Sequence, residues 1–223
     1  MEKKAIIFDL DGTLWNGTDK SLHIYNEVFS HSDKVPRSVT QQEVNDTMGM
    51  FMPDVVATLF PELPLEDRMA LAQECCEAEV AYFYEHGAVL YPHVEETLHL
   101  LAEKYDLYVA SNCQEGYIEA FIHAHKLDGV FADFEMPGRT GKYKGENVRL
   151  LLERNGVQQA IMVGDTYMDQ EAAAFVGIPF VHAKYGFGQV TGEDAVMEDF
   201  AQLPEIAERL WEEGECYGKN DRT

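Results

Sequence analysis

The sequence predicts an α/β fold: a Rossmann-like parallel sheet with a small helical cap domain inserted after the first strand. Two observations predict it. Over residues 93–183, short apolar runs alternate with amphipathic helical runs, which is typical of βαβ units. Between the first apolar run and residue 90, only helical periodicity occurs. The 223 residues, 46% of them hydrophobic, are enough for a main core and a second, smaller one.

Five apolar runs are the expected strands of the core, near residues 5–9, 107–111, 130–134, 160–164 and 178–183. Four amphipathic runs are its expected helices, near residues 93–104, 115–126, 145–155 and 169–176. A strand that is followed by a helix and another strand normally crosses over to a parallel neighbour. We therefore expect a mainly parallel sheet covered by helices on both faces.

The stretch after the first strand contains three helical patterns. Residues 19–31 have one apolar face, and Thr40 begins a capping box that starts a second helix. The helix expected over residues 65–84 has an apolar face made of Leu65, Met69, Ala72, Cys76, Val80 and Phe83. These helices predict a second domain; the alternative is that they simply pack on the main core.

The domain boundaries follow from these patterns. We assign residues 1–15 and 89–213 to the core and residues 16–88 to the cap, with hinges near 15–18 and 85–91. The polar segment 214–223 is expected to be a flexible tail.

The chain is strongly acidic, with 40 Asp and Glu against 17 Lys and Arg and a net charge of −23. This balance argues against nucleic-acid binding, which needs basic residues for the phosphate backbone. No apolar run is long enough to span a membrane, and no signal peptide is recognisable. The four cysteines form no CxxC pair, so we expect neither a disulfide framework nor a zinc site, and a cytoplasmic location.

The first apolar run ends in Asp9-Leu10-Asp11-Gly12-Thr13. Two carboxylates two residues apart at the end of a strand would both lie at the edge of the sheet, where they repel each other. Such a pair is costly unless a cation or a proton resolves it. We interpret it as chemistry, in which one carboxylate is a nucleophile, the other carries a proton and a divalent metal lies between them.

Later strands also end in polar groups. Ser111 and Asn112 follow the second strand, where the hydroxyl and nearby backbone N–H groups suit a phosphate oxygen. Asp165 follows the fourth strand, and Asp169 lies one turn further on. Because a carboxylate at a helix N-terminus also caps the helix, a purely structural role is plausible for Asp169.

Two lysines, Lys142 and Lys144, precede the helix near 145–155. In so acidic a chain, a short basic turn before a helix N-terminus is an unusual positive spot, although such a turn is also common on protein surfaces.

The order of these four segments resembles the haloacid dehalogenase superfamily: DxDGT, a strand-end serine, a lysine before a helix, and GDxxxD. The resemblance covers nearly the whole chain and includes the helical insertion of the subfamily with a C1-type cap. It is greatest to phosphoglycolate phosphatase-like enzymes. Tyr91-Pro92-His93-Val94, similar to the family's Y-P-G-V, and Tyr185-Gly186-Phe187-Gly188 add to it.

This resemblance implies that the first strand is central, flanked by the second and the fourth, so that Asp9, Ser111 and Asp165 meet at the carboxyl ends of the strands. It also implies a phosphatase that hydrolyses a small phosphate ester. Asp9 would be the nucleophile that forms an aspartyl-phosphate. Asp11 would protonate the leaving group and then activate water.

The resemblance further implies a magnesium site. Mg²⁺ would be held by Asp9, the backbone carbonyl of Asp11 and Asp165. Asp169 would be a further catalytic residue that supports the metal either as a direct ligand or from behind the ligands. The second aspartate of the first motif is absent from family members that cleave carbon–halogen bonds. Its presence as Asp11 therefore favours phosphoryl transfer over dehalogenation.

The substrate phosphate would be bound by Ser111, Asn112 and one lysine. Lys144 leads a "K-G-x-x-hydrophobic" pattern. Lys142 has the spacing of the commoner "K-P-x-P" form, without its prolines. We favour Lys144.

Alternatives remain open at this point. A sugar-phosphate mutase of the β-phosphoglucomutase type would share every motif, and a non-catalytic binding protein would be expected to lack Asp9, Asp11 or the lysine. In the cap, we consider Asn16, Thr18 and the turn at 48–53 as specificity residues. The Met and Phe side chains of 48–52 could face a substrate, but core packing is the preferred interpretation. The oligomeric state is not indicated.

Overall fold

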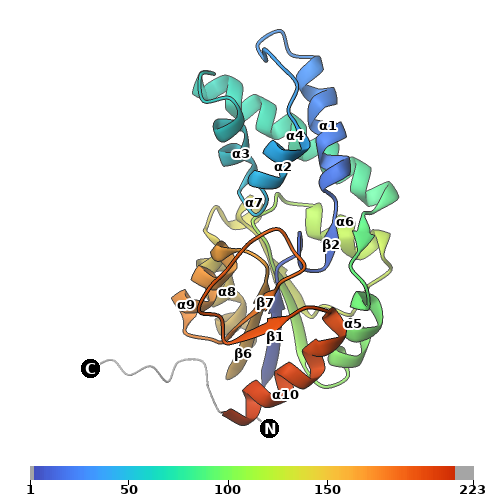
Figure 1. The fold of residues 1–223 in the computed structure, drawn as a ribbon, viewed down its shortest axis with the longest axis vertical. Coiled ribbons are helices and arrows are strands. Elements are labelled where there is room, and N and C mark those ends of the chain that lie inside the picture. Colours follow the sequence, from blue (N-terminus) through green and yellow to red (C-terminus); the bar gives the residue numbers. More distant parts are fainter. Residues whose placement is uncertain (1–2, 214–223) are drawn as a thin grey trace, which may run out of the picture.

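The computed structural model describes residues 3–213 (Figure 1). Six strands form one parallel sheet in the order β5-β4-β1-β6-β7-β8. They are β1 (Lys4–Phe8), β4 (Asp106–Ala110), β5 (Asp133–Glu135), β6 (Gln159–Gly164), β7 (Phe180–Ala183) and β8 (Ala195–Met197). The predicted α/β fold is confirmed, and β1 lies between β4 and β6 as expected.

Helices cover both faces of this sheet. On one face pack α5 (Val94–Ala102), α6 (Tyr117–Ala124) and α10 (Leu203–Glu213), and on the other α8 (Lys144–Asn155) and α9 (Tyr167–Val176). Strand β1 shows why two layers are needed. Ile6 and Phe8 belong to the first apolar cluster, and Ala5 and Ile7 belong to the second, because side chains alternate along a strand.

The helices inserted after β1 lie beyond the carboxyl ends of the strands, at the top of Figure 1. They are α1 (Thr18–Ser30), α2 (Gln41–Asp46), α3 (Met52–Leu59) and α4 (Leu65–His86). The capping box predicted at Thr40 is present: its hydroxyl accepts from the Glu43 backbone, and its own N–H bonds the Glu43 carboxylate over 2.8 Å.

The chain passes into and out of this insertion through a two-stranded ribbon. β2 (Trp15–Asn16) pairs antiparallel with β3 (Val89–Leu90), at the two segments predicted as hinges. Helix α4 packs on α6, and Phe60 and Phe83 of the insertion belong to the same apolar cluster as one face of the sheet. The apolar core is thus continuous between the two parts, and the division into two domains stays a prediction.

Some expected elements differ from the structure. The strand expected at 130–134 is observed at Asp133–Glu135, because Val130 and Phe131 are buried in the turn that precedes it. Leu65 and Met69 of α4, expected in its apolar face, are exposed. Within residues 3–213, the sequence did not predict the ribbon of β2 and β3, α3, α7 (Pro137–Thr140), β8, the short 3₁₀ helix Phe200–Gln202 or α10, which follows it. The tail predicted at 214–223 lies outside the described residues.

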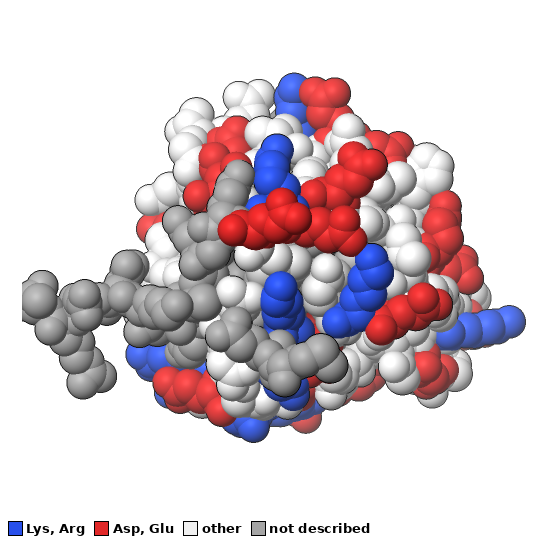
Figure 2. All heavy atoms as spheres, turned by 90° about the horizontal axis from the view of Figure 1, so that it is seen from below, with Lys and Arg blue, Asp and Glu red and all other residues white. Residues whose placement is uncertain are grey.

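Figure 2 shows the face opposite α1–α4, at the amino ends of the strands. In the described part of this face, Lys and Arg side chains lie among Asp and Glu side chains and form no continuous basic patch. Pairs such as Lys3–Asp106, at 2.8 Å, and Lys104–Glu208, at 2.9 Å, account for this mixture. Within residues 3–213, none of the helices combines the length and apolar character that crossing a bilayer requires.

Candidate active site

The carboxyl ends of three neighbouring strands bring the predicted acidic and hydroxyl residues together. Asp9 directly follows β1, Ser111 follows β4 and Asp165 follows β6. Because β1 lies between β4 and β6, these three side chains share one edge of the sheet. All three are buried.

Lys144, the first residue of α8, reaches into this edge. Its Nζ donates hydrogen bonds of 2.7 Å to Oδ1 of Asp9 and 2.6 Å to Oδ1 of Asp169. The lysine side chain is only 3% exposed. Burial lowers the pKa of Lys144, but the charges of Asp169 and Asp9 outweigh burial and raise it above its ordinary value. The ammonium therefore stays charged.

Lys142, the other candidate, points elsewhere. Its side chain is 45% exposed, and its Nζ lies 3.7 Å from Glu146 on the surface. The structure thus places Lys144 in the site and Lys142 outside it.

Three buried carboxylates surround this single ammonium. Oxygens of Asp9, Asp165 and Asp169 all lie within 4.8 Å of one another. Burial and the charge of Asp169 raise the pKa of Asp9 to about 6 despite Lys144, and burial with the charges of Asp169 and Asp9 raises the pKa of Asp165 as well. Such crowding of negative charge is relieved by a cation, and a set of oxygen ligands suits a hard divalent ion. The residues therefore fit a divalent metal.

The segment after β7 holds Asp165 in place. Oδ2 of Asp165 accepts a 2.7 Å hydrogen bond from the backbone N–H of Phe187, which belongs to this segment. Gly12, with φ +84°, packs so closely that a Cβ there would lie 2.3 Å from Oδ2 of Asp165. This contact explains the glycine of the DxDGT motif, and the Phe187 bond explains the position of the Tyr185–Gly188 segment beside the site.

Asp169 combines the two roles that the sequence left open. Its Oδ2 accepts hydrogen bonds from the backbone N–H and the hydroxyl of Thr166, at 2.9 and 2.8 Å, which completes a capping box at the start of α9. Its Oδ1 accepts from Lys144. Asp169 therefore caps a helix and positions the site lysine at the same time.

Asp11 lies in a different environment from Asp9. Its Oδ1 accepts hydrogen bonds from the indole N–H of Trp15, at 2.9 Å, and from the hydroxyl of Tyr117, at 3.0 Å. Burial, followed by the charges of Asp9 and Glu79, raises the pKa of Asp11 to about 7. A carboxyl group that titrates near neutral pH is suited to give and take a proton.

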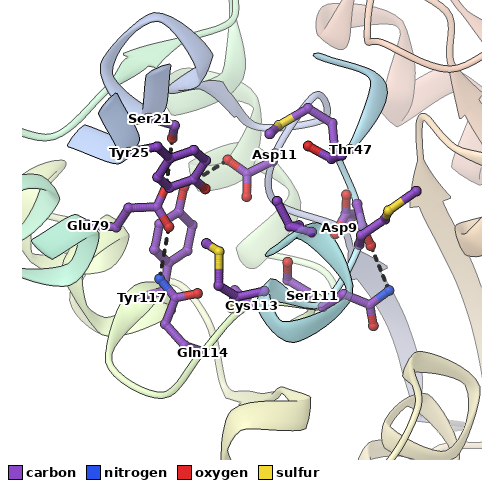
Figure 3. Close-up of a pocket in the computed structure, with 16 residues that line it drawn as sticks. Asp9, Asp11, Ser21, Tyr25, Thr47, Glu79, Ser111, Cys113, Gln114 and Tyr117 are labelled. Carbon is purple, nitrogen blue, oxygen red and sulfur yellow. Dashed lines mark hydrogen bonds between the residues drawn. The ribbon is translucent and has the colours of Figure 1, made fainter. Parts of the chain in front are cut away.

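A cavity of about 50 Å³ lies between these strand ends and the inserted helices (Figure 3). Asp9, Asp11, Ser111 and Asn112 line it from the sheet. The Nδ2 of Asn112, expected to bind substrate, donates a 2.8 Å hydrogen bond to the carbonyl of Gly49 in the insertion. Asn112 therefore ties the core to the turn that covers the cavity.

The specificity residues expected in the insertion are only partly at the cavity. Met48, Met50 and Met52 line it and also pack on the apolar cluster, so both interpretations of that stretch apply. Asn16 and Thr18 are instead bonded to each other, at 2.9 and 3.1 Å, at the start of α1, and are not among the lining residues.

Several residues at the site were not predicted: Trp15, Glu79, Gln114 and Tyr117. Glu79 of α4 is 3% exposed and lines the cavity. Its place between the buried Cys75 and Phe83, at helical spacing, was the available signal, because a charged residue in a buried helical face needs an explanation.

The family model for haloacid dehalogenase-like hydrolases matches residues 6–183. The chain belongs to this family. A phosphoglycolate phosphatase of Rhodospirillum rubrum is 29% identical over 218 residues, covering 90% of this chain and 89% of that protein. The phosphoglycolate phosphatase of Escherichia coli is 24% identical, covering 82% of each. These relatives confirm the predicted likeness and support the predicted enzyme class, a phosphoric monoester hydrolase.

Solved structures show the same fold. A predicted phosphoglycolate phosphatase from Haemophilus somnus has a TM-score of 0.80 at 22% identity, covering 93% of this chain and 99% of that one. CbbY from Rhodobacter sphaeroides, in complex with phosphate, has a TM-score of 0.76 at 21% identity, covering 91% of this chain and 96% of that one. The six-stranded core with its helical insertion is thus an arrangement that the family shares.

Proposed function

We propose that this hydrolase is a Mg²⁺-dependent phosphatase that acts on a small phosphate ester through an aspartyl-phosphate on Asp9. The observation that supports it best is the contrast between two neighbouring acids. Asp9 is bonded to the ammonium of Lys144, which stabilises its charge, whereas Asp11, with a pKa near 7, is bonded to neutral donors. A nucleophile must be ionised and a general acid protonated, and these surroundings suit those roles.

In the first step, an oxygen of Asp9 attacks phosphorus and the bond from phosphorus to the ester oxygen breaks. Asp11 gives its proton to that oxygen, so the product leaves as an alcohol. In the second step, Asp11 takes a proton from water, the resulting hydroxide attacks phosphorus, and the bond from phosphorus to Asp9 breaks. Inorganic phosphate leaves, and both carboxyl groups return to their starting states.

Lys144 and Ser111 would bind the oxygens of the transferring group. Both are buried at the edge of the sheet next to Asp9, where a fixed ammonium and hydroxyl act more strongly than in water. Asp9, Asp165 and the backbone carbonyl of Asp11 would hold Mg²⁺, which supplies positive charge to the phosphate oxygens when bound. Asp169 would keep Lys144 in place.

The cavity favours hydrolysis over the mutase alternative. A mutase must retain a sugar bisphosphate and therefore needs cationic groups for a second phosphate. None of the 16 described residues that line the cavity is Lys, Arg or His.

Other parts of the prediction stay proposals. A small-molecule ester is the expected partner, since the inserted helices restrict access to Asp9. A cytoplasmic setting also stays a prediction; Cys75, Cys76 and Cys113 are free thiols.

The test is phosphate release from p-nitrophenyl phosphate with Mg²⁺ and with EDTA. We expect turnover that needs the metal and is lost in Asp9→Asn, while Asp19→Asn, an exposed aspartate of α1, leaves it unchanged. Activity that persists in Asp9→Asn would exclude the aspartyl-phosphate. Beryllium fluoride, which mimics a phosphoryl group on a carboxylate, should bind the wild type and not the variant.

A further inference from the structure

The cavity has a third carboxylate, besides Asp9 and Asp11, at the end away from Asp9. Glu79 is contributed by α4 of the insertion, and Figure 3 shows it across the cavity from Asp9, with Asp11 between them in that view. Oε1 of Glu79 accepts a 2.6 Å hydrogen bond from the hydroxyl of Ser21, and Oε2 accepts a 3.1 Å bond from the amide of Gln114. Both oxygens thus accept hydrogen bonds from neutral donors, which favour the ionised form of the carboxylate.

No positive side chain balances Glu79 within the cavity. Its lining contains three acids, Asp9, Asp11 and Glu79, and no Lys, Arg or His. Lys144 is already bonded to Asp9 and Asp169 at the other end. The remaining polar groups near Glu79 are neutral: the hydroxyls of Ser21, Tyr25 and Tyr117 and the amide of Gln114.

The proposed chemistry directs the leaving group toward this end. In phosphoryl transfer the attacking and leaving oxygens lie roughly in line on opposite sides of phosphorus. The leaving oxygen must therefore point away from Asp9 and reach Asp11, its proton donor. The rest of the alcohol then extends past Asp11 toward the end of the cavity that Glu79, Gln114 and Tyr117 line.

We propose that this site selects phosphate esters of small, uncharged, hydroxylated alcohols, and that Glu79 rejects esters whose alcohol bears a carboxylate. The inference rests on the proposed phosphatase activity and adds the class of substrate. A hydroxyl can donate to Glu79 and accept from Gln114. A carboxylate at the same place would face Glu79 without a cation, and like charges placed together in a poorly solvated site repel strongly.

A cationic alcohol would have to compete with the hydrogen bonds that Glu79 already accepts. Glu79 already receives hydrogen bonds from Ser21 and Gln114, so its charge is stabilised without an ammonium. The substrate class inferred here differs from phosphoglycolate, for which the relatives are named, because the alcohol released from phosphoglycolate carries a carboxylate.

Three esters of nearly equal size test the proposal: 2-hydroxyethyl phosphate, 2-phosphoglycolate and phosphoethanolamine. Their alcohols are neutral, anionic and cationic. With the wild type and Mg²⁺, we expect kcat/KM for 2-hydroxyethyl phosphate to exceed that for 2-phosphoglycolate at least about tenfold, and to exceed that for phosphoethanolamine. Glu79→Gln should lower the ratio of kcat/KM for 2-hydroxyethyl phosphate to kcat/KM for 2-phosphoglycolate about tenfold, mainly by raising kcat/KM for 2-phosphoglycolate. Glu74→Gln, an exposed glutamate on the same helix, should leave it unchanged.

Any other result of this assay overturns a specific part of the proposal. Phosphoglycolate hydrolysed as fast as the neutral ester overturns the proposal, and a preference for phosphoethanolamine replaces it with a cationic substrate class. An unchanged ratio in a folded Glu79→Gln variant removes the role of Glu79; if that variant does not fold, the wild-type ratio still decides the substrate class. Hydrolysis of p-nitrophenyl phosphate but of none of the three esters overturns only this inference. Hydrolysis of nothing overturns the phosphatase as well.

Discussion

The hydroxyl of Tyr117 donates a 3.0 Å hydrogen bond to Oδ1 of Asp11, across 106 positions of sequence. Tyr117 lies in the first turn of α6, next to the helix α4 that carries Glu79. The bond therefore connects the proposed proton donor to the place where the insertion packs on the core.

Tyr117→Phe removes this bond and keeps the ring. We expect kcat to fall about fivefold, because one fixed donor to Asp11 is lost and a neutral hydrogen bond is worth about 1 kcal/mol. KM should change less than about twofold. Steady-state kinetics with p-nitrophenyl phosphate measure both, with Tyr167→Phe, an exposed tyrosine, as the control. An unchanged kcat would mean that Tyr117 does not position Asp11.

Lys144→Met should lower kcat about 10²–10³-fold, as does the loss of one fixed donor to a transition state in other enzymes. It should also lower the free energy of unfolding by about 3–5 kcal/mol, because three buried carboxylates lose their only ammonium. Urea unfolding without metal measures this. Lys142→Met should change stability by less than about 0.5 kcal/mol and keep activity. Loss of activity and stability in Lys142→Met, but not in Lys144→Met, would show that Lys142 is the lysine of the site.

Metal binding can be followed without turnover. We expect Mg²⁺ to raise the unfolding midpoint of the wild type, by an amount equivalent to about 2.7 kcal/mol at 100 times the dissociation constant. Asp165→Asn should abolish this increase. In EDTA, the unfolding midpoint of Asp165→Asn should equal or exceed that of the wild type, because the variant lacks one of the buried negative charges that repel each other. A variant that still responds fully to Mg²⁺ would exclude Asp165 as a ligand.

Glu79 should make stability depend on pH. Burial raises its pKa above the ordinary value of 4.5, although hydrogen bonds from Ser21, Tyr25 and Gln114 oppose the shift. The folded protein then binds this proton more tightly than the unfolded chain does. The free energy of unfolding should therefore fall as pH rises from 4.5 through the folded pKa.

In Glu79→Gln this loss should be absent, so the variant should gain stability over the wild type as pH increases. Urea unfolding at several pH values tests this, with Glu74→Gln as the control. A difference between variant and wild type that is the same at every pH would contradict it. The titratable groups that act on Glu79 or respond to its charge are Asp11, Tyr25, Cys75, Cys76 and Tyr117.

The sequence predicts those parts of the molecule whose signal is local. The runs that end at Asp9, Ser111 and Asp165 are apolar and bounded by turn residues, so the strands and their edge could be located. The order of the strands came from the family resemblance. The sequence did not predict β8, because this strand has only three residues and lies at the edge of the sheet.

Helical periodicity gave the wrong face for part of α4. An apolar stripe predicts burial only where the partner surface is apolar. The side of α4 at the cavity has the polar Glu79 instead, while Leu65 and Met69 at the far end of the helix are exposed. The bond of Asp11 to Tyr117 depends on packing between segments 106 positions apart, which no local pattern records.

The ribbon formed by β2 and β3 has a mechanical consequence. Trp15 pairs with Leu90 and Asn16 with Val89, so the two chain crossings behave as a single attachment. A body held at one attachment can swing without stretching either connection. Admission of a substrate would then require the release of contacts between the insertion and the core, such as the bond between Asn112 and Gly49 and the packing of α4 on α6, while every helix keeps its own hydrogen bonds.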